Sequence, residues 1–282
     1  MLLGLRVEHR GEYWWAARLL VMGVLLAALP VPGIAASALQ EGGEASAYNG
    51  VLHRAALIID DVGETLHNGR RAVDLPGEVT IAVLPHTPYG RELAERAQQR
   101  GREVMLHLPM EAKNRANPGP GAVLLDMDEE EVRAAVRAAL ADVPHVRGVN
   151  NHMGSLVTRH PGHMQWVMEE LAAAGDLYFI DSRTSARTVA QRIAAEQRLK
   201  NSARAYFLDP VRDGEVIDLQ IQQFIAAAQR EEGVIAIGHP YPETLERLER
   251  ILPKLAQKGI ELVPASALVD YPPKDPVEEM EP

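Results

Sequence analysis

From residue 53 onward, short apolar runs alternate with segments of helical periodicity, and no feature of the sequence restricts the fold more. The apolar runs have the length and composition of strands that are buried on both faces. They lie at residues 55–59, 79–84, 103–108, 146–149, 177–180, 205–208, 234–237 and 260–263. Helices are expected at 89–100, 128–141, 161–174, 186–200, 217–232 and 242–258. This alternation predicts parallel strands that are joined by crossover helices.

Eight such strands in one stretch of chain predict a closed or nearly closed sheet. We therefore expect an α/β fold, a (β/α) barrel of seven or eight parallel strands in a single domain over residues 53–270. An open, doubly wound sheet with helices on both faces is the alternative.

The N-terminal 38 residues have the pattern of an export signal. Arg6, Arg10 and Arg18 precede a short apolar core at 19–29, and small residues follow at 35–38. A spanning helix needs about 20 apolar residues, so this core is short for a permanent anchor. An uncleaved anchor is the alternative, and it would also place the remaining chain outside the cytoplasm.

The segments on either side of the domain complete the expected organisation. Residues 1–38 are the signal peptide, residues 39–52 form a linker, and residues 271–282 form a flexible tail. We expect an exported, periplasmic protein that meets the membrane only through its N-terminal signal.

Charge and cysteine content exclude several classes of function. The formal net charge is −10 at pH 7, whereas a protein that binds nucleic acid usually presents a basic face. The chain contains no cysteine, so disulfides, thiolate zinc sites and cysteine nucleophiles are excluded. Any metal must therefore be held by His, Asp or Glu.

Polar residues follow most of the expected strands at the point where each strand ends. Because the C-terminal ends of parallel strands meet on one face, these side chains should line one rim. The candidates are Asp60, Asp61, His86, His107, Glu111, Asn150, Asn151, His152, Asp181, Arg183, Asp209 and His239.

Several of these residues also have a purely structural interpretation. Asp60 and Asp61 could form a turn or cap a helix, and two neighbouring residues of a strand are expected to point to opposite sides. His86 could bond only a backbone carbonyl, and Asp181 could cap the following helix. The run from Asn150 to His152 is harder to explain by packing, because three buried polar side chains all need partners.

Histidine and carboxylate without cysteine suit zinc or a similar divalent ion, which activates water for hydrolysis of an amide or ester. The chain lacks a G-x-S-x-G elbow and the glycine-rich phosphate-binding motifs. A glycosidase with paired carboxylates is a weaker alternative, since the rim holds more histidine than that chemistry uses.

Seven stretches of the sequence resemble the divergent polysaccharide deacetylases, the YibQ-type relatives of the NodB-type carbohydrate esterases. They lie at residues 58–63, 83–87, 104–111, 148–155, 181–184, 207–209 and 235–240, and the resemblance extends over about residues 53–269. The string Asn-Asn-His-Met-Gly-Ser at 150–155 is its most specific part.

The resemblance implies roles for individual residues. Asp60 matches the catalytic base, Asp61 the neighbouring metal ligand, His107 the first metal-binding histidine, and His239 the general acid. The second metal-binding histidine of the family would fall at position 111, which is Glu here. Either Glu111 takes its place or His152 supplies the imidazole, and we favour His152.

The Arg-Pro-Pro-Tyr-Gly type motif that orients the base in the wider family is absent, and residues 150–152 occupy its place. Arg183 or Arg204 could substitute for its arginine. His86, Glu111, Asn150, Asn151, Asp181 and Arg183 are expected to contact the substrate or the ligands.

Two functional hypotheses follow. The first is an exported hydrolase, dependent on a divalent metal such as zinc, that removes acetyl groups from a polysaccharide or related sugar of the cell envelope. The second is a catalytically inactive carbohydrate-binding or interaction protein of the envelope with the same fold. The sequence specifies neither the sugar nor the oligomeric state.

Overall fold

The computed structural model describes residues 52–270, so the predicted signal, nearly all of the predicted linker and the predicted tail lie outside the described residues. The described strands are His53–Val62 (β1), Thr80–Val83 (β2), Val104–Met110 (β3), Val146–Met153 (β4), Tyr178–Asp181 (β5), Lys200–Ala203 (β6), Tyr206–Phe207 (β7), Val234–Gly238 (β8) and Ile260–Leu262 (β9). The α-helices are Leu66–Val73 (α1), Gly90–Gln99 (α2), Glu129–Asp142 (α3), Pro161–Ala173 (α4), Ala190–Glu196 (α5), Gly214–Ala228 (α6) and Pro242–Ile251 (α7).

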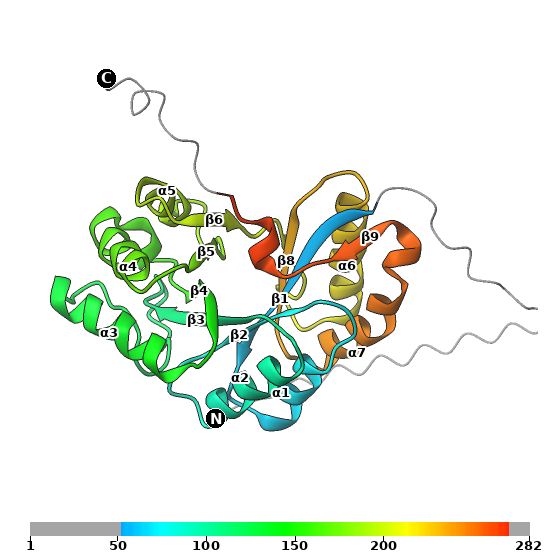
Figure 1. Ribbon diagram of the computed structural model, residues 1–282, viewed down its shortest axis with the longest axis horizontal. Coiled ribbons are helices and arrows are strands. Elements are labelled where there is room, and N and C mark those ends of the chain that lie inside the picture. The colour runs from blue at the N-terminus through cyan, green and yellow to red at the C-terminus, as the bar shows by residue number, and fades with distance from the viewer. Residues whose placement is uncertain (1–51, 271–282) are drawn as a thin grey trace, which may run out of the picture. The chain divides into compact units, whose positions relative to one another are not determined.

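The strands form one parallel sheet in the order β6-β5-β4-β3-β2-β1-β8-β7, with β9 paired to the start of β1. The edge strands β6 and β7 are consecutive in the chain and are separated only by Arg204 and Ala205. This link spans at most about 11 Å, so the two edges must lie close together. The sheet is therefore curled into a nearly closed barrel, which confirms the predicted single-domain fold (Figure 1).

Alternate residues of each strand belong to two separate cores. On β1, Ala55, Leu57 and Ile59 pack in the larger core, which includes the inner faces of the helices. Ala56 and Ile58 point the other way, into a smaller core inside the barrel. The period of two along a strand thus decides which side chains face the barrel interior.

A network of polar side chains closes the interior at the N-terminal ends of the strands. The 3-10 helix at Ala265–Leu268 (η4) lies there, and the backbone N–H of Ala265 donates to Thr80 Oγ1. Glu103 Oε1 accepts hydrogen bonds from Tyr178, Thr80 and the backbone of Ser266. The C-terminal segment of the described chain is therefore anchored across the base of the barrel.

The secondary structure departs from the sequence expectation in four places. Helix α1 and strand β6 were not predicted, and the expected helix at 186–200 is only α5. Strand β6 carries Lys-Asn-Ser-Ala, all half-buried, so it lacks the apolar run that marks a central strand. The expected helix at 242–258 is α7 followed by the 3-10 turns Leu252–Lys254 (η2) and Ala256–Lys258 (η3).

No helix between residues 52 and 270 has the length and apolar character that crossing a membrane requires.

Candidate metal centre

The interior face of the barrel changes from apolar to polar near the C-terminal ends of the strands. On β1, Asp60 follows Ala56 and Ile58 at the spacing that faces the interior. On β3, His107 follows Met105 in the same way. Asn150 and His152 occupy this phase on β4, and His239 follows Ile235 and Ile237 just after β8. Strand periodicity therefore brings these five side chains to one end of the barrel interior.

Asp61 reaches the same site by a bend in the backbone. The pairing of β1 with β2 shifts between Ile59 and Val62, and Asp61 has a φ of 56°. Such a φ is uncommon for a residue other than glycine and is often found at functional sites. The expectation that Asp60 and Asp61 point to opposite sides is wrong, because this bend turns the second carboxylate back toward the first.

Three side chains converge at the centre of the site. Asp61 Oδ1 lies 2.8 Å from His152 Nδ1 and 3.1 Å from His107 Nε2. The two ring nitrogens are 3.2 Å apart. Asp61, His107 and His152 are the three residues proposed from the sequence as metal ligands, and they form a possible metal site with all ligand atoms within 4.8 Å of one another.

Asn150 connects this cluster to Asp60. Its amide nitrogen donates a hydrogen bond to Asp60 Oδ1 at 2.7 Å, so its oxygen is the atom that faces His107 Nδ1, also at 2.7 Å. Since that oxygen can only accept, His107 Nδ1 carries the proton. A neutral His107 then presents the lone pair of Nε2 to the cluster, as a metal-ligating histidine must.

His239 lies on the other side of Asp61, with 3.7 Å between its Nε2 and Asp61 Oδ2. Asp209 fixes the imidazole from behind, because its Oδ1 is 2.8 Å from His239 Nδ1 and its Oδ2 accepts from the backbone of His239 and from Thr244. The ring of Tyr241 stacks on the imidazole with 5.2 Å between the ring centroids. The ring of Phe207 contacts the imidazole edge-on, with 5.5 Å between the centroids. The imidazole is therefore held in one orientation.

The electrostatics of the site favour a positive charge at its centre. Burial would raise the pKa of Asp61, but hydrogen bonds from His107 and His152 lower it. Burial would lower the pKa of His107, but the charges of Asp60 and Asp61 raise it. The negative charge of Asp60 and Asp61 that favours a protonated His107 also favours binding of a metal cation between these side chains.

The two flanking residues have shifted pKa values as well. Burial raises the pKa of Asp60. Burial would lower the pKa of His239, but Asp209 and Asp61 raise it to about 9. Strong shifts of this kind are common in groups that transfer protons, and here they coincide with the polar end of the barrel.

A divalent metal fits these residues. Asp61 Oδ1 is buried, and the groups that approach it are the ring nitrogens of His107 and His152, which can themselves bind a metal. Ligand atoms of a tetrahedral zinc site lie roughly 3.3 Å apart, close to the 2.8–3.2 Å found here. Two imidazoles and one carboxylate are a donor set that zinc and similar ions accept, with one position left for water.

Two other predicted residues have their contacts elsewhere. Glu111 Oε2 accepts a hydrogen bond from the backbone of Leu125 at 2.9 Å, so this carboxylate supports the loop after β3. His86 lies beside Asp142 at the end of α3, with 3.6 Å between Nδ1 and Oδ1. Of the two alternatives for the third ligand, the structure places His152 in the cluster and Glu111 outside it.

Asn151, Asp181 and Arg183 also stabilise the rim and do not enter the cluster. Asn151 Oδ1 accepts from the backbone of Ser182, which ties β4 to the loop after β5. Asp181 accepts from Thr188 and from the backbone N–H groups of Arg183 and Gln191, so it caps the turn before α5. Asn151 and Asp181 occupy the strand phase that faces the helices, and this places them behind the site.

Three residues next to the site were given no specific role in it from the sequence. Asp209 was a candidate for the rim because it ends the sixth expected strand, but its contact with His239 was not predicted. Tyr241 and Phe207 carried no such signal, because aromatic residues near strand ends are common in cores. Arg204 donates to the backbone oxygens of Ser182 and Arg183 across the barrel edge, and its charge interacts with Asp60.

The chain is similar to proteins of one family. A family model described as divergent polysaccharide deacetylase matches residues 57–269. The uncharacterized protein YibQ of Escherichia coli (strain K12) is 37% identical over 220 residues, which are 78% of this chain and 68% of YibQ. An uncharacterized protein of Haemophilus influenzae is 35% identical over 208 residues, 74% of each chain.

Among solved structures, the uncharacterized protein ATU2773 from Agrobacterium tumefaciens C58 matches with a TM-score of 0.74 and 23% identity. The match covers 79% of this chain and 91% of that protein. It shows that the two chains share their fold.

Proposed function

Since the chain belongs to the divergent polysaccharide deacetylase family, we propose that it is an exported, metal-dependent hydrolase that removes acetyl groups from a polysaccharide or related sugar of the cell envelope. The family supports carbohydrate deacetylation as the class of reaction. The observation that carries the finer proposal is the cluster of Asp61, His107 and His152, with Asp60 on one side and His239 on the other.

Asp61, His107 and His152 would hold the metal, and zinc suits this donor set best. A divalent cation held there would polarise the acetyl carbonyl and lower the pKa of an attacking water. Asn150 keeps Nε2 of His107 directed at the cluster through its bond to Nδ1. The chain thus supplies both the ligands and the residue that orients one of them.

Asp60 has the position of a general base. Asn150 occupies its Oδ1, while Oδ2 faces the cluster and lies 3.6 Å from His107 Nε2. That second oxygen is the atom that takes the proton of the attacking water. Burial raises the pKa of Asp60, which makes the carboxylate a stronger proton acceptor than an exposed aspartate.

His239 has the position of a general acid. Asp209 Oδ1 accepts a hydrogen bond from Nδ1 and holds the ring, which leaves Nε2 pointing toward Asp61. In the metal-free site Asp209 and Asp61 raise the pKa of His239 to about 9, and the bond to Asp209 favours a protonated imidazole that can give the Nε2 proton to a leaving nitrogen or oxygen. Water adds to the acetyl carbon, the bond to the sugar breaks, and acetate and the free amine or alcohol are released.

A protein that binds an envelope carbohydrate without hydrolysing it is the second candidate. The observation that favours it is Glu111, which stands where the wider family is expected to have a metal-binding histidine and which bonds the backbone of Leu125. Such a protein would use the same polar rim for binding.

An assay of acetate release separates the two functions. We expect the zinc-loaded full chain to release acetate from N-acetylated amino-sugar oligomers or from an O-acetylated polysaccharide. Asp60→Asn should slow this release by at least roughly 100-fold, whereas Asp126→Asn, a change at an exposed carboxylate, should not. Binding of these sugars by the wild type and by Asp60→Asn, with no acetate released by either, would establish the binding protein instead.

A further inference from the structure

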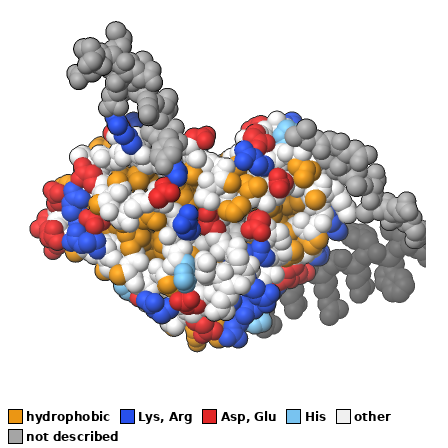
Figure 2. All heavy atoms as spheres, in the orientation of Figure 1, with side chains coloured by type: hydrophobic (Ala, Val, Ile, Leu, Met, Phe, Trp, Pro, Cys, Tyr) orange, Lys and Arg blue, Asp and Glu red, His pale blue; other side chains and the backbone are white. Residues whose placement is uncertain are grey.

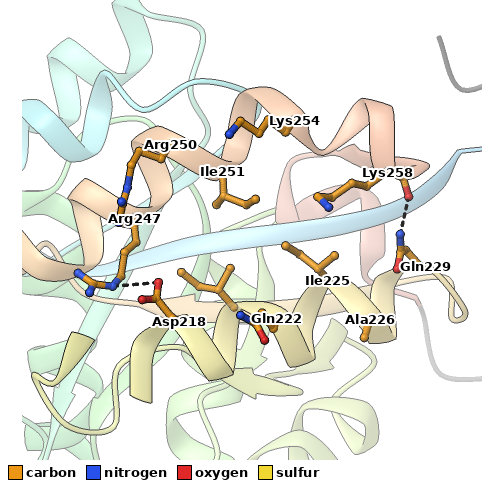
Figure 3. Close-up of a pocket in the computed structure, with 11 residues that line it drawn as sticks. Asp218, Gln222, Ile225, Ala226, Gln229, Arg247, Arg250, Ile251, Lys254 and Lys258 are labelled. Carbon is orange, nitrogen blue, oxygen red and sulfur yellow. Dashed lines mark hydrogen bonds and ion pairs between the residues drawn. The ribbon is translucent and has the colours of Figure 1, made fainter. Parts of the chain in front are cut away.

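A groove runs along the outside of the barrel between α6 and α7. It encloses about 540 Å³ and is drawn in Figure 3. Ile221 and Ile225 of α6 and Ile251 of α7 contribute its apolar lining. Leu219, also on α6, is 51% exposed, so this helix presents further apolar surface to solvent.

A row of cations forms one edge of the groove. Arg250, Lys254 and Lys258 follow one another at intervals of four residues along α7, η2 and η3, and all three are exposed (Figure 3). No carboxylate in residues 52–270 forms an ion pair with any of them. The acidic residue of the groove, Asp218, is already bound to Arg247, with 3.0 Å between Oδ1 and Nε.

Unlike this row, many basic side chains on the described surface have acidic partners. On the face shown in Figure 2, basic and acidic side chains are interspersed. Arg133 and Arg137, for example, each pair with two or more glutamates of α3 and α4. In a chain with a net charge of −10, three neighbouring cations without partners produce a local attraction for negative charge.

The groove is separate from the metal centre. Its far end is Lys258, and the next residue, Gly259, accepts a backbone hydrogen bond from His53 at the start of β1. Asp60 lies seven residues further along β1, which corresponds to roughly 23 Å of extended strand. The Lys258 end of the groove is therefore far from the metal centre.

We propose that the α6–α7 groove binds an acidic amphipathic helix of a partner protein. A third helix can pack between two helices, and its apolar face would cover the partly exposed Ile225 and Ile251. Carboxylates along one edge of the partner would match the row of Arg250, Lys254 and Lys258. This row spans roughly 12–16 Å, because the 3-10 turns η2 and η3 rise more per residue than α7. A simple polyanion would satisfy the cations but would leave the isoleucines uncovered.

The test uses a designed helical peptide of 16 residues, with leucines on one face and glutamates along one edge. We expect fluorescence anisotropy to show saturable binding to the full chain. Arg250→Glu with Lys254→Glu should weaken it at least tenfold, and a peptide with lysine in place of glutamate should recover binding to this variant. The matched control, Arg187→Glu with Arg230→Glu, carries the same charge change outside the groove and should bind like the wild type.

Three results would overturn the proposal. The first is no binding of the acidic peptide, and the second is equal binding of a scrambled peptide that lacks an apolar face. The third is peptide binding that the Arg250→Glu, Lys254→Glu variant retains in full. The peptide could also fail to bind while the wild type binds anionic phospholipid vesicles or self-associates. If the Arg250→Glu, Lys254→Glu variant then loses either property, the groove binds another ligand and the proposal is wrong.

Discussion

Oδ1 of Asp61 lies 2.8 Å from Nδ1 of His152, so a residue of β4 joins the ligands that β1 and β3 provide. Glu111 lies only four residues after His107, but its carboxylate bonds the backbone of Leu125. In the proposed metal site, the third ligand would thus come from the neighbouring strand β4 rather than from the segment that follows His107.

We expect His152→Ala to lower zinc affinity more than about 100-fold, since even changes to residues behind the ligands cost 10–100-fold. Glu111→Gln should change zinc affinity little. Metal content after dialysis, measured by elemental analysis, checks both variants. Retention of zinc by His152→Ala together with its loss from Glu111→Gln would assign the third ligand to Glu111.

The Asp60→Asn change should lower the rate of deacetylation by roughly 10²- to 10⁴-fold, the range of a lost general base. Asparagine has nearly the same shape but cannot accept the proton of water. Zinc content should stay near that of the wild type, because Asp60 is not in the ligand cluster. Unchanged turnover in this variant would show that another group accepts the proton.

The Asn150→Leu change should destabilise the protein by about 1–3 kcal/mol, because it leaves His107 Nδ1 and Asp60 Oδ1 buried without their partner. Urea denaturation of the metal-free chain measures this loss. As a control, Asn117→Leu alters an exposed turn and should cost much less. Equal stability of the two variants would show that the Asn150 bridge contributes little.

The pair of His239 and Asp209 should make stability depend on pH. The pKa of His239 is about 9 in the folded protein against 6.5 in the unfolded chain, so its contribution is fully present below pH 6.5. The contribution declines as the pH rises to about 9, and it is on the order of 3 kcal/mol. Urea denaturation of metal-free wild type and His239→Gln at pH 6 and pH 9.5 measures it. If the stability difference between the two proteins is the same at both pH values, the prediction fails.

The Gly148→Ala change should disrupt the barrel interior. A Cβ at Gly148 would lie 2.3–2.5 Å from atoms of the Tyr178 ring, which is buried and bonded to Glu103. Overpacking of this kind typically costs 1–3 kcal/mol. Thermal unfolding checks the loss, and Gly162→Ala, where a Cβ meets open space, is the control.

Much of the site could be predicted because strand periodicity is visible in the sequence. Asp60, His107, Asn150 and His239 all continue the alternation of residues that face the barrel interior. The same alternation places Asn151 on the opposite face of the sheet, toward the helices. The position of Asp61 could not be predicted, because it depends on a left-handed backbone conformation and a register shift that periodicity does not reveal. Strand β6 was missed because an edge strand without apolar residues has no such pattern.

The interior of the barrel has an apolar layer and a polar layer, and substitutions in one layer can accumulate separately from those in the other. The apolar layer of Ala56, Ile58 and Met105 holds the strands together, and the polar layer above it contains the proposed metal ligands. Substitutions in the polar layer can therefore alter the site while the apolar layer preserves the architecture. In a deep mutational scan, we therefore expect substitutions near the first residues of each strand to impair folding most. Substitutions near the last residues of each strand should impair activity most.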